Sequence, residues 1–171
     1  RGDLLLAYDD SIDVYFLPEG VFLDKDGSDS AARILLDPLA KKLGVEVWLG
    51  VTQQAHGAPV NASVEVVSKR FTQSDNPMPF FYGSANGSPA GRFGLNGGIA
   101  KTRAGPAVVW FCYESIGLPA WFRTALNPGK PVVLLTNHWW MPTGPLPNAL
   151  YSAGRSGARL NSHQPLIAAN R

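Results

Sequence analysis

Three short apolar runs constrain the fold of this chain more than any other feature of its sequence. IDVYFL (12–17), PAVVWF (106–111) and PVVLLT (131–136) are largely apolar, and each stops at polar or reactive side chains. Runs of this length and composition are typical of buried β-strands. Segments 28–44 and 118–126 carry apolar residues at helical spacing. Strands that alternate with helices predict an α/β fold with crossover connections.

The same patterns predict the remaining elements. We expect strands at 45–51, 62–67 and 165–169 and a helix within 146–162. Pro38 lies inside the 28–44 helix and predicts a kink or an early end of that helix.

Residues 72–98 differ in composition from the segments on either side, because they are rich in Gly, Pro, Ser and Asn with interspersed aromatic residues. We expect a long loop here. The sequence leaves open whether this loop only covers the surface or closes over a site as a lid.

The composition fits one globular domain, residues 1–171. The chain is 45% hydrophobic and 16% charged, and its formal net charge is only +2. The basic residues are scattered, which argues against nucleic acid as a partner. The single cysteine excludes an internal disulfide and a thiolate metal cluster, and we expect neither a metal site nor a cofactor. No apolar run approaches the roughly 18 to 20 residues that span a bilayer.

The two ends of the chain suggest that it is part of a longer protein. It opens on Arg1 rather than methionine, and it stops at LIAANR, directly after an expected strand. We therefore expect a domain truncated at both ends.

Candidate chemistry gathers where the strands end. Glu19 follows the first strand, Cys112 follows 106–111, and Asn137 to Trp140 follow 131–136. In an α/β sheet, ligands collect at the carboxyl ends of the strands. A carboxylate, a thiol and an amide next to indoles are therefore expected at one edge.

Two interpretations of Cys112 remain open from the residues alone. A lone cysteine at the end of an apolar strand is often a small core residue. As a nucleophile it would need a base, which Glu19 could supply, and a cation for the developing charge. His138, directly after a strand, offers an alternative Cys-His arrangement, with His56 and His163 less well placed.

The order of these residues resembles the nitrilase, or carbon–nitrogen hydrolase, superfamily. Strand-Pro-Glu, a lysine after a strand, strand-Cys-Tyr-Glu and strand-Asn-x-Trp occur in the order typical of that family. The resemblance implies an αββα sandwich and a Glu-Lys-Cys triad. FCYES (111–115) and TNHWW (136–140) are similar to the branch of apolipoprotein N-acyltransferase and the conjugal-transfer TraB proteins. The family resemblance covers residues 12–170 and is most specific over residues 107–141.

The resemblance also implies a role for each site residue. Glu19 would be the general base and Cys112 the nucleophile that forms a thioester. The backbone N–H of Tyr113 would share the oxyanion hole with the lysine, and Glu114 would support the lysine and the substrate. The substrate pocket would be walled by Asn137, His138, Trp139 and Trp140.

The lysine of the triad has two candidates. Lys69 follows the strand at 62–67, midway between Glu19 and Cys112, and it is the preferred one. Lys101 lies only eleven residues before Cys112 and more plausibly belongs to a hairpin. The chain lacks the Pro-Phe-Gly-Glu that the family often carries after its lysine, and it has Asn137-His138 where the branch often has Asn-Asp.

Two functions follow from this resemblance. The first is a thiol-dependent amidase or N-acyltransferase that acts on a small-molecule or lipid acyl or amide substrate and is linked to plasmid conjugal transfer. The alternative is a catalytically inactive nitrilase-fold binding or assembly module. The relatives further imply a bacterial, membrane-associated, periplasm-facing domain with a tether outside this chain and a homodimer, while the sequence leaves a cytoplasmic location open.

Overall fold

A computed structural model describes residues 11–18, 30–55, 58–73, 97–137, 144–160 and 166–170. Its elements, in chain order, are β1 (Val14–Leu17), α2 (Ser30–Leu43), β2 (Glu46–Ala55), β3 (Ala58–Glu65), β4 (Phe71–Gln73), β5 (Ile99–Thr102), β6 (Gly105–Phe111), the 3₁₀ turn η2 (Cys112–Ile116), α3 (Leu118–Ala125), β7 (Val132–Asn137), α4 (Pro145–Leu160) and β8 (Leu166–Asn170). Within the described ranges, no helix is both long enough and apolar enough to cross a membrane.

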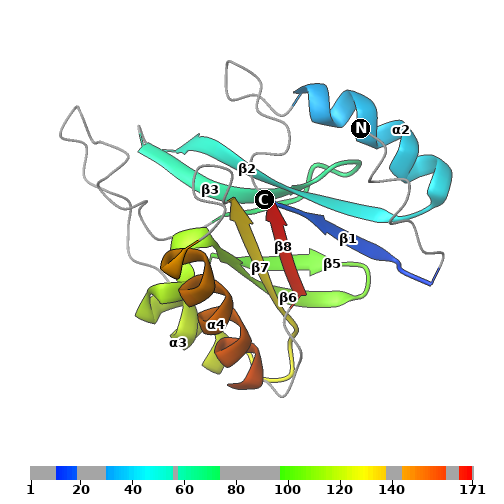
Figure 1. Cartoon of the computed structure of the whole chain (residues 1–171). Helices are drawn as coiled ribbons and strands as arrows, with labels where there is room; N and C mark the ends of the chain where they lie inside the picture. The colour runs from blue at the N-terminus through cyan, green and yellow to red at the C-terminus, as the bar shows by residue number, and fades with distance from the viewer. Residues whose placement is uncertain are drawn as a thin grey trace.

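The strands form two four-stranded sheets, one in each half of the chain (Figure 1). In the first sheet β1 pairs parallel with β2, and β2, β3 and β4 continue as an antiparallel meander. In the second sheet β5 pairs antiparallel with β6, and β6, β7 and β8 are parallel. Helix α2 connects the parallel pair of the first sheet, and α3 and α4 make the connections in the second.

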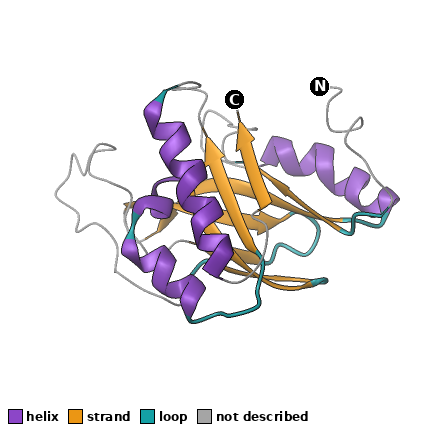
Figure 2. Cartoon of the chain, turned by 60° about the horizontal axis from the view of Figure 1, so that its bottom comes forward, coloured by secondary structure: helices purple, strands orange, loops and turns teal. Residues whose placement is uncertain are grey.

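Helices cover the outer faces of both sheets, as Figure 2 shows. Leu36 and Ala40 of α2 pack on Val47 and Leu49 of β2. Ala120 of α3 and Ala158 of α4 pack against the second sheet, in one buried cluster with Val108, Trp110, Val132 and Leu134. The order of layers is helix, sheet, sheet, helix, so the predicted αββα sandwich is confirmed.

A third apolar cluster fills the space between the two sheets. Trp48 of β2 stacks on Phe16 of β1 with ring centroids 6.0 Å apart, and both pack against Val109 and Phe111 of β6. Alternate β6 residues therefore face the other sheet or the helices. Because both faces of β6 are covered, its sequence is continuously apolar.

Most elements predicted from the sequence are present, with some corrections. Helix α2 runs through Pro38 to Leu43, so the early end predicted at this proline is wrong. Strands β2 and β3 are longer than predicted and form a hairpin. The short strands β4 and β5 were not predicted as strands, although the hairpin expected around Lys101 is present as β5–β6. Of the predicted loop, residues 74–96 lie outside the described residues.

Candidate active site

The thiol of Cys112 lies at the carboxyl edge of the second sheet, the edge at which β6, β7 and β8 end. Phe111 pairs with Leu135, and Asn137 with Asn170, so Cys112 follows at the level of the last residues of β7. Cys112 as a residue is partly exposed, and it forms no disulfide. A partly exposed cysteine at a strand end fits a nucleophile better than a sealed core residue.

The turn that carries Cys112 is held by side chains as well as by its backbone. Ser115 Oγ donates to the Cys112 carbonyl oxygen at 2.8 Å, and the Gly117 N–H donates to the Glu114 carbonyl oxygen at 2.8 Å. The Phe111 N–H donates to Glu114 Oε2 at 3.1 Å. Tyr113 lies within η2, and its side chain is outside the description. These contacts fix the backbone on both sides of the thiol.

Glu114 is buried and forms an ion pair with Arg123 of α3. Arg123 Nη2 lies 3.2 Å from Glu114 Oε1, and Nη1 lies 3.2 Å from Oε2. Arg123 Nη1 also donates to the Val109 carbonyl oxygen at 3.0 Å. Glu114 was expected to support a lysine. Among the described residues it contacts an arginine, which the sequence interpretation missed. The one charged residue of the apolar helix LPAWFRTA was the available signal.

Thr136 is a second residue that sequence reasoning missed. Its side chain is fully buried near the end of β7, and its Oγ1 has no hydrogen-bond partner among the described residues. An unpaired buried hydroxyl costs about 1 to 3 kcal/mol. Thr136 directly precedes Asn137 and ends a run that was predicted as a buried strand, but nothing in the sequence marked its hydroxyl as unpaired.

The first sheet brings β1 to the same edge. Strand β1 runs parallel to β2 and contacts both β7 and β8, and Figure 1 shows β1, β7 and β8 ending in one region. Leu17 and Pro18 are the last described residues before the segment that holds Glu19. Glu19 itself, His138, Trp139 and Trp140 lie outside the described residues, as does the side chain of Asn137. Their roles stay predictions.

Lys69 lies at the opposite edge of the sandwich. Trp48 pairs with Glu65, so the turn from Val66 to Arg70 lies beside the start of β2. Arg70 Nη1 donates to the Lys101 carbonyl oxygen at 2.5 Å, and Lys101 pairs with Pro106 near the start of β6.

The distance to Cys112 follows from this register. Cys112 lies six residues after Pro106 along the chain, or about 20 Å at 3.3 Å per residue. Neither Lys69, which is exposed, nor Lys101 can reach the thiol across that distance. The structure therefore does not bring together the predicted triad with either lysine.

The arginines at this opposite edge form ion pairs and hydrogen bonds with neighbouring carboxylates. Glu46 is buried, and its carboxylate accepts from the Trp48 indole N–H at 2.5 Å and from the Arg103 N–H at 2.8 Å. Arg70 Nη2 lies 3.1 Å from Glu46 Oε1, and Arg103 Nη2 lies 2.9 Å from Asp13 Oδ1. The cations join the amino ends of the two sheets, which is a structural task.

Comparison with known proteins identifies the fold. No protein-family model and no curated protein sequence matches this chain, whereas 51 chains of solved structures match its structure. One is the crystal structure of carbon-nitrogen hydrolase from Helicobacter pylori G27, with a TM-score of 0.68 and 14% sequence identity. The match covers 98% of this chain and 64% of that chain. At this identity the likeness shows the fold, which is that of a carbon–nitrogen hydrolase.

Proposed function

We propose that this domain transfers or hydrolyses acyl groups through a thioester on Cys112. The observation that carries the proposal is the place of the partly exposed Cys112 at the end of β6, in a fold shared with a carbon-nitrogen hydrolase. The thiolate attacks the acyl carbonyl carbon of an amide. A C–S bond forms, the C–N bond breaks, and the departing amine takes the proton that the thiol gave up. Water or a second amine then attacks the thioester and restores the thiol.

The Tyr113 N–H is the proposed oxyanion donor. Cys112 opens the 3₁₀ turn η2, and the first N–H groups of such a turn have no carbonyl partner within it. One donor placed about 3 Å from the developing oxyanion is worth roughly 3 kcal/mol of transition-state stabilisation. The contacts of Ser115 and Glu114 support this role, because they fix the backbone around Tyr113.

Glu19 is the proposed general base. It is the next residue after Pro18, and β1 ends at the same edge as Cys112. A carboxylate there can take the thiol proton and later return it to the leaving group. Because Lys69 and Lys101 lie at the edge opposite Cys112, we assign neither of them a catalytic role.

The substrate and the setting rest on the resemblance of residues 107–141. It favours the apolipoprotein N-acyltransferase and TraB branch, and with it a small-molecule or lipid acyl or amide substrate. Asn137, His138, Trp139 and Trp140 would then form the pocket. A link to plasmid conjugal transfer, a membrane tether and a homodimer belong to the same proposal.

Alkylation of Cys112 with iodoacetamide across pH 5–10 tests the catalytic role. A free thiol has a pKa of about 8.5. We expect an activated thiol to react with a midpoint below that value and faster than free cysteine at neutral pH. A midpoint at or above the ordinary value, with no acceleration, would contradict the proposal.

A second candidate function is a nitrilase-fold binding or assembly module without turnover. The placement of Lys69 and Lys101 favours it, because no described lysine lies at the carboxyl edge with Cys112. This alternative predicts that Cys112→Ala leaves biological activity intact and that the thiol reacts no faster than free cysteine.

A further inference from the structure

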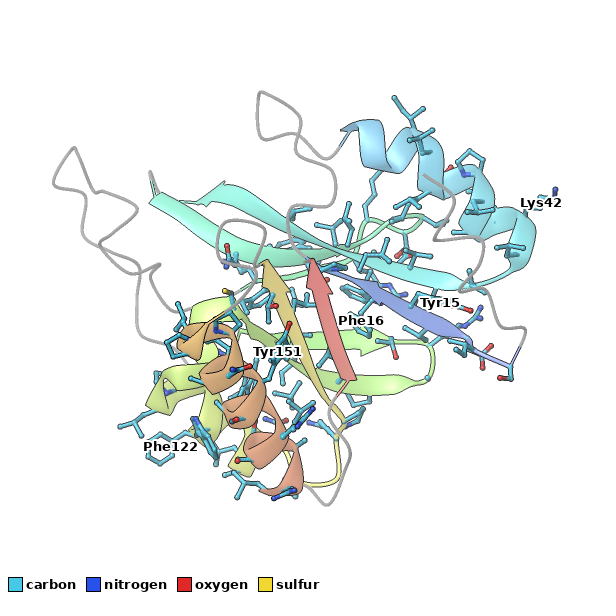
Figure 3. The ribbon with its side chains drawn as sticks, viewed as in Figure 1. Tyr15, Phe16, Lys42, Phe122 and Tyr151 are labelled. Carbon is cyan, nitrogen blue, oxygen red and sulfur yellow. The ribbon has the colours of Figure 1, made fainter. Side chains whose placement is uncertain are left out.

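Arg123 is the most deeply buried cation in the described part of the chain. Its side chain is 0% exposed, and it comes from α3, whose neighbouring residue Phe122 points outward and is 58% exposed (Figure 3). Burying a guanidinium is unfavourable unless it is paired and hydrogen-bonded. The position of Arg123 therefore calls for an account of what it contacts.

The guanidinium lies at the edge of β6, where β5 has not yet begun. The Val109 N–H donates to the Gly98 carbonyl oxygen, and Arg123 Nη1 donates to the Val109 carbonyl oxygen. A Cβ on Gly98 would lie 2.2 Å from Arg123 Nη1, and Gly98 has a φ of +70°. The Arg123 side chain fills the space beside Gly98. Its Nη1 donates to the Val109 carbonyl oxygen, as the backbone N–H of a neighbouring strand would.

A continuous chain of contacts joins Arg123 to the residues around the thiol. Both terminal nitrogens bind the Glu114 carboxylate, and Glu114 Oε2 accepts the Phe111 N–H, one residue before Cys112. A shift of Arg123 would therefore be transmitted through a single carboxylate to the backbone that presents Cys112.

The pair also determines the charge near the thiol. Elements β6, β7, α3 and α4 pack against η2. Their described charged groups are Arg123 on α3 and the exposed Arg155 and Arg159 on α4. The half-buried Tyr151 of α4, labelled in Figure 3, is a further titratable group. Of these groups only Arg123 is buried, and together with the buried Glu114 of η2 it forms a neutral pair.

We propose that Arg123 is a positioning residue for Cys112, which acts through Glu114 to fix the η2 turn and to cancel the carboxylate charge next to the thiol. The inference rests on the proposed function of Cys112 and assigns that site a residue that does not itself touch substrate. Arginine suits the task because it stays protonated and binds a carboxylate through two nitrogens.

The test compares iodoacetamide alkylation of Cys112 across pH in four proteins: the unaltered chain, Glu114→Gln, the double variant Glu114→Gln/Arg123→Met, and Thr124→Val. Glu114→Gln keeps the shape of the side chain and an oxygen for the Phe111 N–H, but it leaves the Arg123 charge unbalanced. Thr124→Val is the matched control. Thr124 is the next residue of α3, is fully buried, and accepts from the Trp110 indole N–H at 2.8 Å, away from Glu114.

We expect Glu114→Gln to move the midpoint of the alkylation profile down by about one pH unit, because an unbalanced buried cation favours the thiolate. The double variant should return the midpoint to that of the unaltered chain, and Thr124→Val should lower stability without moving it. If Glu114→Gln and the unaltered chain have the same midpoint, the inference is overturned. This comparison alone decides the matter if the double variant does not fold. If the thiol of the unaltered chain reacts no faster than free cysteine but Glu114→Gln still moves the midpoint, the proposed function is contradicted and the role of Arg123 stands.

Discussion

The carboxylate of Glu114 accepts the backbone N–H of Phe111 at 3.1 Å, so a side chain two residues after Cys112 binds the backbone one residue before it. This hydrogen bond links the residues on the two sides of Cys112 and so fixes the turn that carries the thiol. It shows that the glutamate of FCYES shapes the site, whatever further part it takes in the chemistry. The buried pair of Glu114 with Arg123 extends this shaping to α3.

Removing the Glu114 carboxylate should be strongly destabilising. Glu114→Ala leaves the fully buried Arg123 with no counter-charge among the described residues, and breaking a buried pair from one side costs about 3 to 5 kcal/mol. Urea denaturation measures the free energy of unfolding. The control is Asp37→Ala, which breaks the exposed α2 pair of Asp37 with Lys41 at 2.8 Å and should cost less than about 1 kcal/mol. Equal losses in the two variants would contradict the structural role of Glu114.

Lys69 should be dispensable for thiol chemistry. Because it lies at the edge opposite Cys112, Lys69→Met should leave both the rate and the pH profile of Cys112 alkylation unchanged. Arg70→Met, the adjacent change, should lower stability through loss of its Glu46 contact without moving the profile either. A loss of thiol reactivity in Lys69→Met alone would mean that the lysine reaches the site after all.

The backbone at Lys69 predicts a gain in stability on substitution by glycine. Lys69 has a φ of +60° and its N–H donates to the Glu65 carbonyl oxygen in a tight turn. Glycine adopts this conformation without the strain of a Cβ, so Lys69→Gly should raise the free energy of unfolding by up to about 1 kcal/mol. Lys42→Gly, within α2, should lower it by about 1 kcal/mol. Thermal denaturation of both variants checks the opposite signs.

Helix α4 should not tolerate a methyl group at Gly157. A Cβ there would lie 2.0 Å from the ring of the buried Trp110 of β6. Gly157→Ala should therefore destabilise the fold by about 1 to 3 kcal/mol through overpacking. Ser156→Ala, one residue earlier on the exposed face, should be nearly neutral. A neutral Gly157→Ala would contradict the packing of α4 on the second sheet.

Thr136 offers a test of what its unpaired hydroxyl is for. Thr136→Val keeps the shape and removes a buried group that has no partner in the described residues. We expect stability to be unchanged or raised by about 1 kcal/mol. If stability rises while thiol acylation falls, the hydroxyl serves the site. A clear loss of stability would show that it has a structural partner.

The apolar runs predicted the α/β fold and its main strands well because they report burial directly, whereas the αββα sandwich was implied by the family resemblance. The strand at 106–111 has helices on one face and the other sheet on the other, so every position from Ala107 to Phe111 is apolar. The position of Cys112 at the end of that strand followed from the same run.

The position of the catalytic lysine was predicted wrongly, because the pattern of a single strand does not show which way that strand runs in the sheet. Lys69 follows a strand, as the triad requires, but β3 runs antiparallel to β1 and its carboxyl end lies at the wrong edge. Direction depends on pairing, which residue types do not reveal. Arg123 was missed because its partner Glu114 is nine residues away on another element, and only the fold brings them together.

The central claim is that Cys112 accepts an acyl group, and intact-mass measurement after incubation with p-nitrophenyl butyrate tests it most directly. We predict one added butyryl group for each chain, located on Cys112, removed by hydroxylamine, and absent in Cys112→Ala. A chain that stays unmodified while its thiol is still titrated by a disulfide reagent in the folded state would contradict the account and leave only the fold.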